Sequence, residues 1–268
     1  MPSFMADSPA EEANRQLISV WNSFALRYPG GHVAELDGVN IAWADVQAPF
    51  LNMAVLSSPV TDALDLGRRV AATLEFAVQR RRPWFFLVCW DWIPEALAAD
   101  AEGCFLAHGL VRVTENTGMI AETLLPPSRR LPATEIRPVR CPETRRAVGE
   151  INALAYEIPL RWGVEATEIE SLWDERTFGV LAFVEGRPVS CAVTFVSDGR
   201  LYVAYVATLP EYRGYGYAET AMRECLERAA RASGFARSVL HATPAGRPLY
   251  ERMGFREAAR YILYAQPH

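Results

Sequence analysis

Two glycines stand where a strand-like run gives way to a helix, in the stretch LPEYRGYGYAET at residues 209–220. The apolar run Leu201–Ala207 precedes this stretch. After it, apolar residues recur on one helix face with a 3.6-residue period: Ala218, Ala221, Met222, Cys225, Leu226 and Ala229. Glycine costs a helix about 1 kcal/mol relative to alanine, so Gly214 and Gly216 at its start indicate a requirement of the backbone.

A turn that leads into a helix exposes backbone N–H groups that lack an intrahelical partner, and the helix dipole adds positive potential. Together these features form an anion site. Small residues let a phosphate approach the backbone, and a guanidinium such as that of Arg213 can fork onto its oxygens. The segment Arg213–Ala218 therefore contains the parts of a pyrophosphate cradle.

The same two glycines are also compatible with a simple tight turn, because glycines occur in most turns. The segment is not a GxGxxG motif, and no acidic ribose ligand is placed about twenty residues further on. A dinucleotide site is therefore disfavoured. The residues alone leave the tight turn and the phosphate cradle open.

A stretch rich in proline and charge, LLPPSRRLPATEIRP at residues 124–138, reads as a linker near the chain midpoint. We expect one domain at 1–125 and a second at 134–268. In the second half the pattern predicts, in order, a strand, two helices, three strands joined by hairpin turns, a long helix, a strand, a short helix and a last strand. The main ranges are Glu135–Arg140, Pro142–Tyr156, Phe178–Val184, Val189–Val196, Leu201–Ala207, Ser238–His241, Pro244–Met253 and Arg260–Tyr264.

The first half repeats part of this order, which predicts an internal duplication. Strands are expected at Asn40–Asp45, Phe50–Leu56 and Trp84–Trp90, with a helix at Asp62–Arg82 between the last two. The segment FLAHGL at 105–110 stands where YERMGF stands at 250–255. The first half has no cradle: its turn reads SSPVTDALD, in which Thr61 and Asp62 are ordinary helix caps and Asp62 repels phosphate.

The second half resembles the GNAT (GCN5-related N-acetyltransferase) superfamily, whose acyl-CoA loop carries Arg/Gln-x-x-Gly-x-Gly/Ala. Arg213, Gly216 and Ala218 occupy its fixed positions, and TPAGRPLYERMGF is similar to a later helix of the family. The resemblance covers roughly residues 134–265. It implies an α/β (α+β) protein with a mixed, mainly antiparallel twisted sheet flanked by helices. The chain would then be a tandem of two GNAT-like halves, the first of them degenerate.

The resemblance also implies residue roles for acetyl-CoA, the expected cosubstrate. Backbone groups of Val206 and Thr208 would bind the pantetheine arm in the split between two diverging strands. The pyrophosphate would be held by the loop and helix start: Arg213, Gly214, Tyr215, Gly216, Tyr217 and Ala218. Thr243 stands where many relatives carry a cofactor-facing asparagine, and its hydroxyl offers one donor fewer.

Acyl transfer to an amine requires a deprotonated amine, donors for the thioester oxygen and a proton for the leaving thiolate. Tyr250 stands where many relatives have a tyrosine near the CoA sulfur, and a phenol of pKa about 10 suits a thiolate of about 8–9. The alternative is a core tyrosine. No base is obvious: a solvent water serves as well as Glu157, which alternatively is a solvated loop acid. Tyr156 and Trp162 line the acceptor site or belong to the core, and His241 is expected to be a core histidine.

Composition excludes several other classes. All 27 basic residues are arginine, so no lysine is present for a Walker motif, a Schiff base or a pyridoxal anchor. The net charge of −5 argues against nonspecific binding to nucleic acid. The five cysteines have no CxxC spacing, and with the histidines they form no metal pattern. No window has the ~18 apolar residues of a membrane span and no leader is evident, so we expect a cytoplasmic protein without metal.

The sequence thus predicts an acyl-CoA-dependent N-acyltransferase that acts on a small-molecule or peptide amine by direct attack in a ternary complex. Three alternatives remain: a catalytically silent CoA-binding sensor, an O-acyltransferase, and a protein-interaction module that binds no CoA. The identity of the acceptor and the oligomeric state stay open.

Overall fold

The C-terminal segment of the chain, from Arg256 onward, folds with the first half of the sequence. With the described residues up to Ile120 and with Ala242–Ala245 it forms unit 1, whereas Ala121–His241 and Gly246–Phe255 form unit 2. The computed structural model describes residues 8–267. The expectation that no leader is present concerns the first seven residues, which lie outside the described part.

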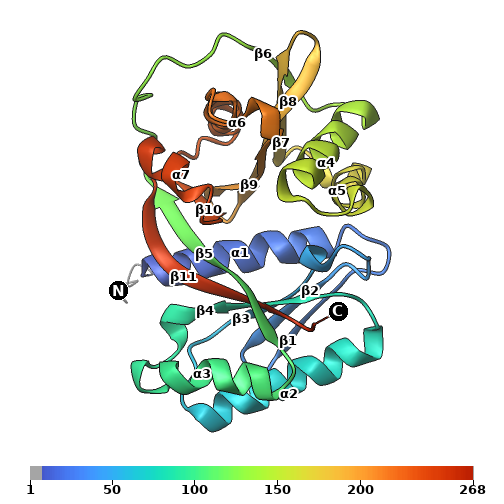
Figure 1. The fold of residues 1–268 in the computed structure, drawn as a ribbon, viewed down its shortest axis with the longest axis vertical. Helices are drawn as coiled ribbons and strands as arrows, with labels where there is room; N and C mark the ends of the chain where they lie inside the picture. Colours follow the sequence, from blue (N-terminus) through green and yellow to red (C-terminus); the bar gives the residue numbers. More distant parts are fainter. Residues whose placement is uncertain (1–7, 268) are drawn as a thin grey trace. The chain divides into compact units, whose positions relative to one another are not determined.

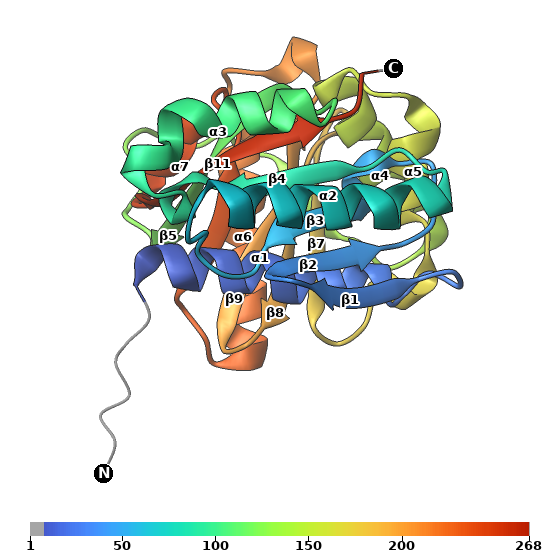
Figure 2. The same ribbon diagram turned by 90° about the horizontal axis from the view of Figure 1, so that it is seen from below.

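Unit 1 is a mixed sheet with helices on both faces (Figures 1 and 2). Its strand order is β1-β2-β3-β4-β11-β5, in which only β3 and β4 pair in parallel. Helices α2 and α3 cover one face and α1 lies on the other. The elements are α1 (Pro9–Ala25), β1 (His32–Leu36), β2 (Val39–Trp43), η1 (Pro49–Leu51), β3 (Asn52–Leu56), α2 (Ala63–Arg80), β4 (Phe85–Cys89), η2 (Trp90–Trp92), α3 (Glu95–Ala107), β5 (Val111–Ala121) and β11 (Arg256–Ala265).

Helix α1 was not predicted from the sequence, because polar residues occupy much of its buried face. Glu12, Asn14 and Gln16 are all buried, which interrupts the apolar period that marks an amphipathic helix. Asn14 Nδ2 donates to the Leu56 carbonyl at 2.7 Å, whereas the buried Oδ1 of the same side chain accepts no hydrogen bond from the described residues. The start of the helix does carry a sequence signature, a capping box in which Ser8 and Glu11 bond each other's backbone N–H.

Strand β11 lies between β4 and β5 and pairs antiparallel with both. Alternate residues on one face of the strand, Ile262 and Tyr264, are buried in the core that α2 and α3 cover. There the Tyr264 ring stacks on Phe105 at 4.1 Å between centroids. The domain predicted at 134–268 included this strand. In the structure the strand belongs to unit 1, because its two edges hydrogen-bond to β4 and to β5 there.

Removing residues 1–125 is expected to give an aggregating or inactive fragment, because it deletes β4 and β5 together. The remaining β11 would expose four consecutive apolar residues that are buried in the whole chain, Tyr261 to Tyr264. Size-exclusion chromatography and an acyltransfer assay of the fragment beside the full chain check this. A soluble, fully active fragment would show that the first half plays no part in folding or activity.

The strands of unit 2 follow one another in the order β10-β9-β8-β7-β6, with α6 on one face and α4 on the other (Figure 1). From α6, the Cys225 thiol donates to the Phe178 carbonyl of β7; from α4, Asn152 Nδ2 lies 3.2 Å from Cys191 Sγ of β8. The elements are β6 (Glu135–Pro138), α4 (Pro142–Tyr156), α5 (Leu160–Thr167), η3 (Glu170–Leu172), β7 (Thr177–Val184), β8 (Arg187–Ser197), β9 (Arg200–Thr208), η4 (Pro210–Tyr212), α6 (Tyr217–Ser233), β10 (Ser238–Ala242) and α7 (Arg247–Met253). Continued by β11, they reproduce the predicted order βααβββαβαβ, and the predicted fold class is confirmed.

Candidate functional site: a glycine loop beside a split pair of strands

Strands β9 and β10 run in parallel but pair over only three residues, Leu201 to Val203 on β9. Strand β9 continues to Thr208 and stays paired with β8 on its other edge. The second part of β9, which includes Val206 and Thr208, therefore lies beyond the parallel pairing. An edge of this kind leaves backbone groups available to an extended ligand that adds to the sheet.

A bulge marks the point at which β9 leaves β10. Between the pairs Cys191–Ala207 and Val193–Ala204 the register shifts, so that Tyr205 and Val206 oppose a single residue of β8. Tyr205 adopts a left-handed conformation with φ of 50°, which costs a bulky residue about 1–3 kcal/mol. No local sequence signal predicts the bulge, because no glycine stands there.

The buried thiol of Cys191 forms a hydrogen bond to the bulge. Burial raises its pKa to about 12, so it stays protonated, and its Sγ donates to the Tyr205 carbonyl at 3.2 Å. Asn152 Nδ2 approaches the same sulfur at 3.2 Å and also donates to the Val148 carbonyl. On the bulge itself, the Val206 carbonyl accepts the Tyr156 hydroxyl at 3.1 Å. Tyr156, predicted to line the acceptor site, therefore reaches the strand predicted to bind pantetheine.

The loop after β9 adopts the backbone that its glycines permit. Gly214 has φ of 85° and Gly216 has φ of 99°, both in the left-handed region that disfavours side chains. Gly216 is the N-cap of α6, and its carbonyl accepts the first helical bond, from Thr220 N at 3.0 Å. A Cβ on Gly214 would meet no atom within 4 Å, so the loop is open on that side. The N–H groups of Tyr217, Ala218 and Glu219 form the first turn, without an intrahelical acceptor.

Arg213 does not lie over the loop. Its Nη2 donates to the Ala155 carbonyl at 2.6 Å, which ties the guanidinium to the last turn of α4. The side chains of the loop that extend outward are aromatic: Tyr215 is 64% exposed, and its ring lies 6.2 Å from that of Tyr217. Arg213 thus joins the loop to the end of α4.

The end of α4 holds the two other predicted acceptor-site residues. Glu157 caps the helix with φ of 54° and is exposed, in keeping with a solvated loop acid. Trp162 lies half-buried in the first turn of α5. These residues and Tyr156 are close along the chain, and among them Tyr156 is the one bonded to β9.

Tyr250 lies on α7 and is 8% exposed. Burial raises its pKa above that of a free phenol, and the neighbouring Tyr156 adds to the increase, so the hydroxyl remains protonated at neutral pH. The helix ends at Gly254 with φ of 101°, and Phe255 N bonds back to the Tyr250 carbonyl at 3.0 Å. A neutral, mostly buried phenol is in the protonation state that a general acid needs.

The turn that ends α3 in unit 1 has the same backbone geometry as the turn that ends α7, but Phe105 stands in the position of Tyr250. After α3, Leu110 N bonds to the Phe105 carbonyl at 3.0 Å and Gly109 has φ of 75°, the geometry seen around Tyr250 and Gly254. The predicted equivalence of FLAHGL and YERMGF therefore holds in backbone geometry. Phe105 has no hydroxyl, so it cannot donate a proton from the position that Tyr250 has in unit 2.

The helix start in unit 1 is closed by its own carboxylates. Asp62 caps α2 by accepting from Asp65 N at 2.9 Å, as predicted for a cap. Burial opposes the ionisation of Asp65, but hydrogen bonds from Arg69, Thr61 and Arg68 outweigh it and lower its pKa. The Arg69 guanidinium also donates to the carbonyls of Gly38, Ser58 and Pro59. An anion would meet two carboxylates there rather than open amides.

Two predicted positions lie near the end of β10. His241 Nδ1 lies 2.9 Å from the buried Tyr202 hydroxyl, and burial lowers its pKa to about 3, so the imidazole is neutral and fits the core role expected of it. Thr243 follows in the segment Ala242–Ala245, which belongs to unit 1 and not to unit 2. Within residues 8–267, no three His, Cys, Asp or Glu side chains are grouped to hold a metal, and no helix has the length and apolar character to cross a membrane.

Part of the chain that includes the glycine loop is similar to a known protein family. Residues 146–255 match the model of the acetyltransferase (GNAT) family. A GCN5-related N-acetyltransferase from Kribbella flavida has a similar structure, with a TM-score of 0.72 at 20% identity over 97% of this chain and 95% of that one. A functionally unknown conserved protein from Staphylococcus epidermidis gives 0.63 at 12% identity, over 88% and 93%.

A tandem GNAT protein from the clavulanic acid biosynthesis pathway gives a TM-score of 0.53 at 12% identity, over 85% of this chain and 77% of that one. No curated protein is similar enough to count as a match. At these identities the solved structures establish the fold alone, and they agree with the predicted fold class.

Proposed function

Because residues 146–255 match the model of the GNAT acetyltransferase family, we propose that the chain is an acyl-CoA-dependent N-acyltransferase with its active site in unit 2. Acetyl-CoA is the proposed donor, and a small-molecule or peptide amine is the acceptor. The observation that carries the proposal is the open glycine loop at the start of α6, which follows the part of β9 that lies beyond its pairing with β10.

The residues present fit acyl-CoA. The amides of residues 214–218 would hold the pyrophosphate, because both glycines have positive φ and the face of Gly214 is open. Val206 and Thr208 would offer backbone groups to the amide-rich pantetheine arm, as an edge strand does to a peptide. The Thr208 hydroxyl bonds Ser190 Oγ of β8 at 2.8 Å.

For the transfer itself, the amine nitrogen bonds to the thioester carbonyl carbon and the carbon–sulfur bond breaks. Backbone donors of β9 near the Tyr205 bulge would polarise the carbonyl oxygen. Tyr250, whose hydroxyl is protonated at neutral pH, would give its proton to the leaving thiolate. The amine proton would leave to water or to Glu157, which is exposed at the end of α4.

The state of the cysteines bears on the cellular compartment of the protein. All five cysteines are free, and burial raises the pKa of Cys89, Cys191 and Cys225 to about 12. Inert buried thiols of this kind suit a reducing compartment, so we place the protein in the cytoplasm. No nucleic-acid or membrane partner is proposed.

A thermal-shift screen with acetyl-CoA, followed by a panel of amines and alcohols monitored for free thiol, tests the function. A ligand bound by the folded state alone raises the melting temperature, so we expect a shift with acetyl-CoA and thiol release with at least one amine. A shift with no turnover would favour the silent sensor, and release with alcohols alone would favour O-acyl transfer. No shift would favour the protein-interaction module.

A further inference from the structure

The segment between β5 and β6 is fixed to unit 2 at both ends. Leu125 N donates to the Met253 carbonyl at the end of α7, and Thr134 Oγ1 donates to the Phe183 carbonyl of β7. Between these anchors the chain runs beside α6 (Figure 1). The segment, residues 126–133, lies within the predicted linker 124–138, for which no functional role was predicted.

This linker passes over the glycine loop. Arg129 Nη2 donates to the Gly214 carbonyl at 3.1 Å. A Cβ on Gly216 would stand 3.4 Å from the same Nη2 and 3.1 Å from Cδ of Pro132. The Arg129 guanidinium therefore lies next to both glycines, where Arg213 was expected.

The other charged side chains considered at the loop are already paired or bonded elsewhere, unlike the Arg129 guanidinium. Glu219 in the first turn of α6 is 3% exposed and pairs with Arg223 at 2.7 Å, so that pair is neutral. Arg213 is bonded to the Ala155 carbonyl. Arg129 makes no ion pair with any carboxylate among residues 8–267, and its charge is uncompensated beside the open amides.

We propose that Arg129 is a further binding residue of the acyl-CoA site and contacts the pyrophosphate. The inference rests on the proposed function, because it assigns the ligand's phosphates to this loop. One guanidinium N–H bonds Gly214 and the remaining four donors are available to fork onto phosphate oxygens. The linker thus completes the cradle that the glycines begin.

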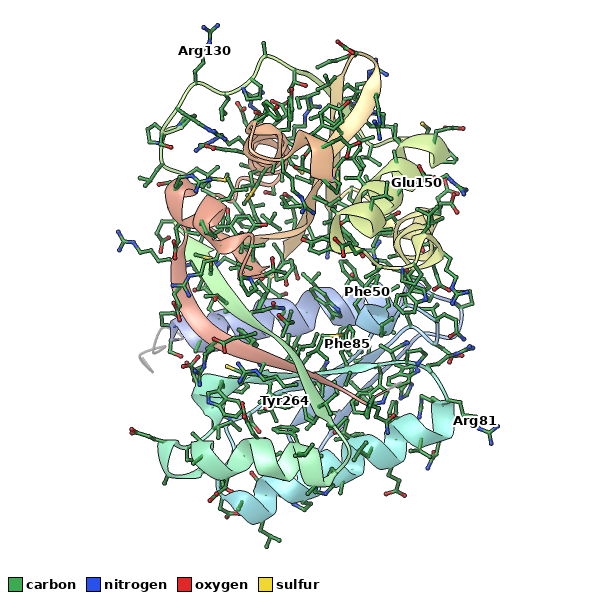
Figure 3. All side chains as sticks on the ribbon, viewed as in Figure 1. Phe50, Arg81, Phe85, Arg130, Glu150 and Tyr264 are labelled. Carbon is green, nitrogen blue, oxygen red and sulfur yellow. The ribbon has the colours of Figure 1, made fainter. Side chains whose placement is uncertain are left out.

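Calorimetric titration of the full chain with acetyl-CoA and with dephospho-CoA tests the proposal. The variant Arg129→Gln keeps an N–H donor for the Gly214 carbonyl and removes the charge. Arg130→Gln is the matched control, because the Arg130 side chain points away from the protein (Figure 3). Charge-assisted bonds to phosphate are stronger than neutral ones, so we expect Arg129→Gln to weaken both ligands by about tenfold. Arg130→Gln should stay within about twofold, since an exposed charge further away is screened.

A contact with phosphate also predicts that the affinity of Arg129→Gln falls less steeply with added salt than that of the wild type. Wild-type affinity in Arg129→Gln would overturn the proposal, as would equal losses in the two variants. A loss for acetyl-CoA alone would contradict the pyrophosphate contact, because dephospho-CoA retains the pyrophosphate and lacks the 3′-phosphate. If the wild type binds neither ligand, the proposed function fails and this inference with it.

Discussion

Gly216→Asp is expected to abolish the thermal stabilisation that acetyl-CoA gives the wild type. Gly216 has φ of 99°, so any side chain there is strained, and its Cβ would stand 3.1 Å from Pro132. The added carboxylate would also repel the pyrophosphate at the helix start, because its negative charge cancels the positive potential of the helix N-terminus. The measurement is the ligand-induced shift in melting temperature.

Gly186→Asp controls for the strain of a side chain at positive φ. Gly186 has φ of 79° in the turn between β7 and β8, and a Cβ there meets nothing within 4 Å. This variant is expected to keep the acetyl-CoA shift even if its own melting temperature falls. An unchanged shift in a folded Gly216→Asp protein would refute the assignment of the glycine loop to the pyrophosphate.

Tyr250→Phe is expected to lower turnover by about tenfold or more while acetyl-CoA affinity is nearly retained. The substitution keeps the ring that packs against Phe255 and removes only the hydroxyl that would protonate the thiolate. Steady-state thiol release gives the turnover, and calorimetry gives the affinity.

Tyr264→Phe is the matched control for Tyr250→Phe. Tyr264 is also buried with a pKa raised by burial, but it belongs to the core of unit 1. Its variant should retain wild-type turnover. If Tyr250→Phe also turns over like the wild type, Tyr250 is a core residue and the acid is another group or water.

The two turns that end α3 and α7 explain why the proposed chemistry is confined to one unit. Both close with the same backbone bond, from Leu110 to Phe105 and from Phe255 to Tyr250. Unit 1 has a phenylalanine where unit 2 has the candidate acid. Its helix start is also occupied by the Asp65–Arg69 pair instead of open amides. A core has been kept in unit 1 without the groups that would bind and protonate CoA.

The elements of unit 2 could be predicted because their patterns are regular. The predicted helix Pro142–Tyr156 coincides with α4, and the strands at 178–184, 189–196 and 201–207 lie within β7, β8 and β9. Apolar alternation and hairpin turns are local signals, so they can be recognised without knowing which segments pack together in the fold. The internal repeat was predicted from the same local signals.

The features that the sequence did not reveal depend on contacts between distant residues. The Tyr205 bulge is stabilised by the thiol of Cys191, and a tyrosine at positive φ has no local signature. The direction of Arg213 is set by the end of α4, and Arg129 reaches the loop from 85 residues away. Strand β11 was assigned to the wrong unit because pairing partners are not encoded in a strand's own alternation.

Calorimetric titration of the full chain with acetyl-CoA is the most direct test of the central claim, that unit 2 contains the single acyl-CoA site. Its glycine loop lies at a helix start within the residues that match the family model, whereas the corresponding start in unit 1 carries Asp62 and Asp65. We predict one acetyl-CoA bound per chain in the wild type and none in Gly216→Asp. No binding by the wild type, or two molecules per chain, would contradict the account.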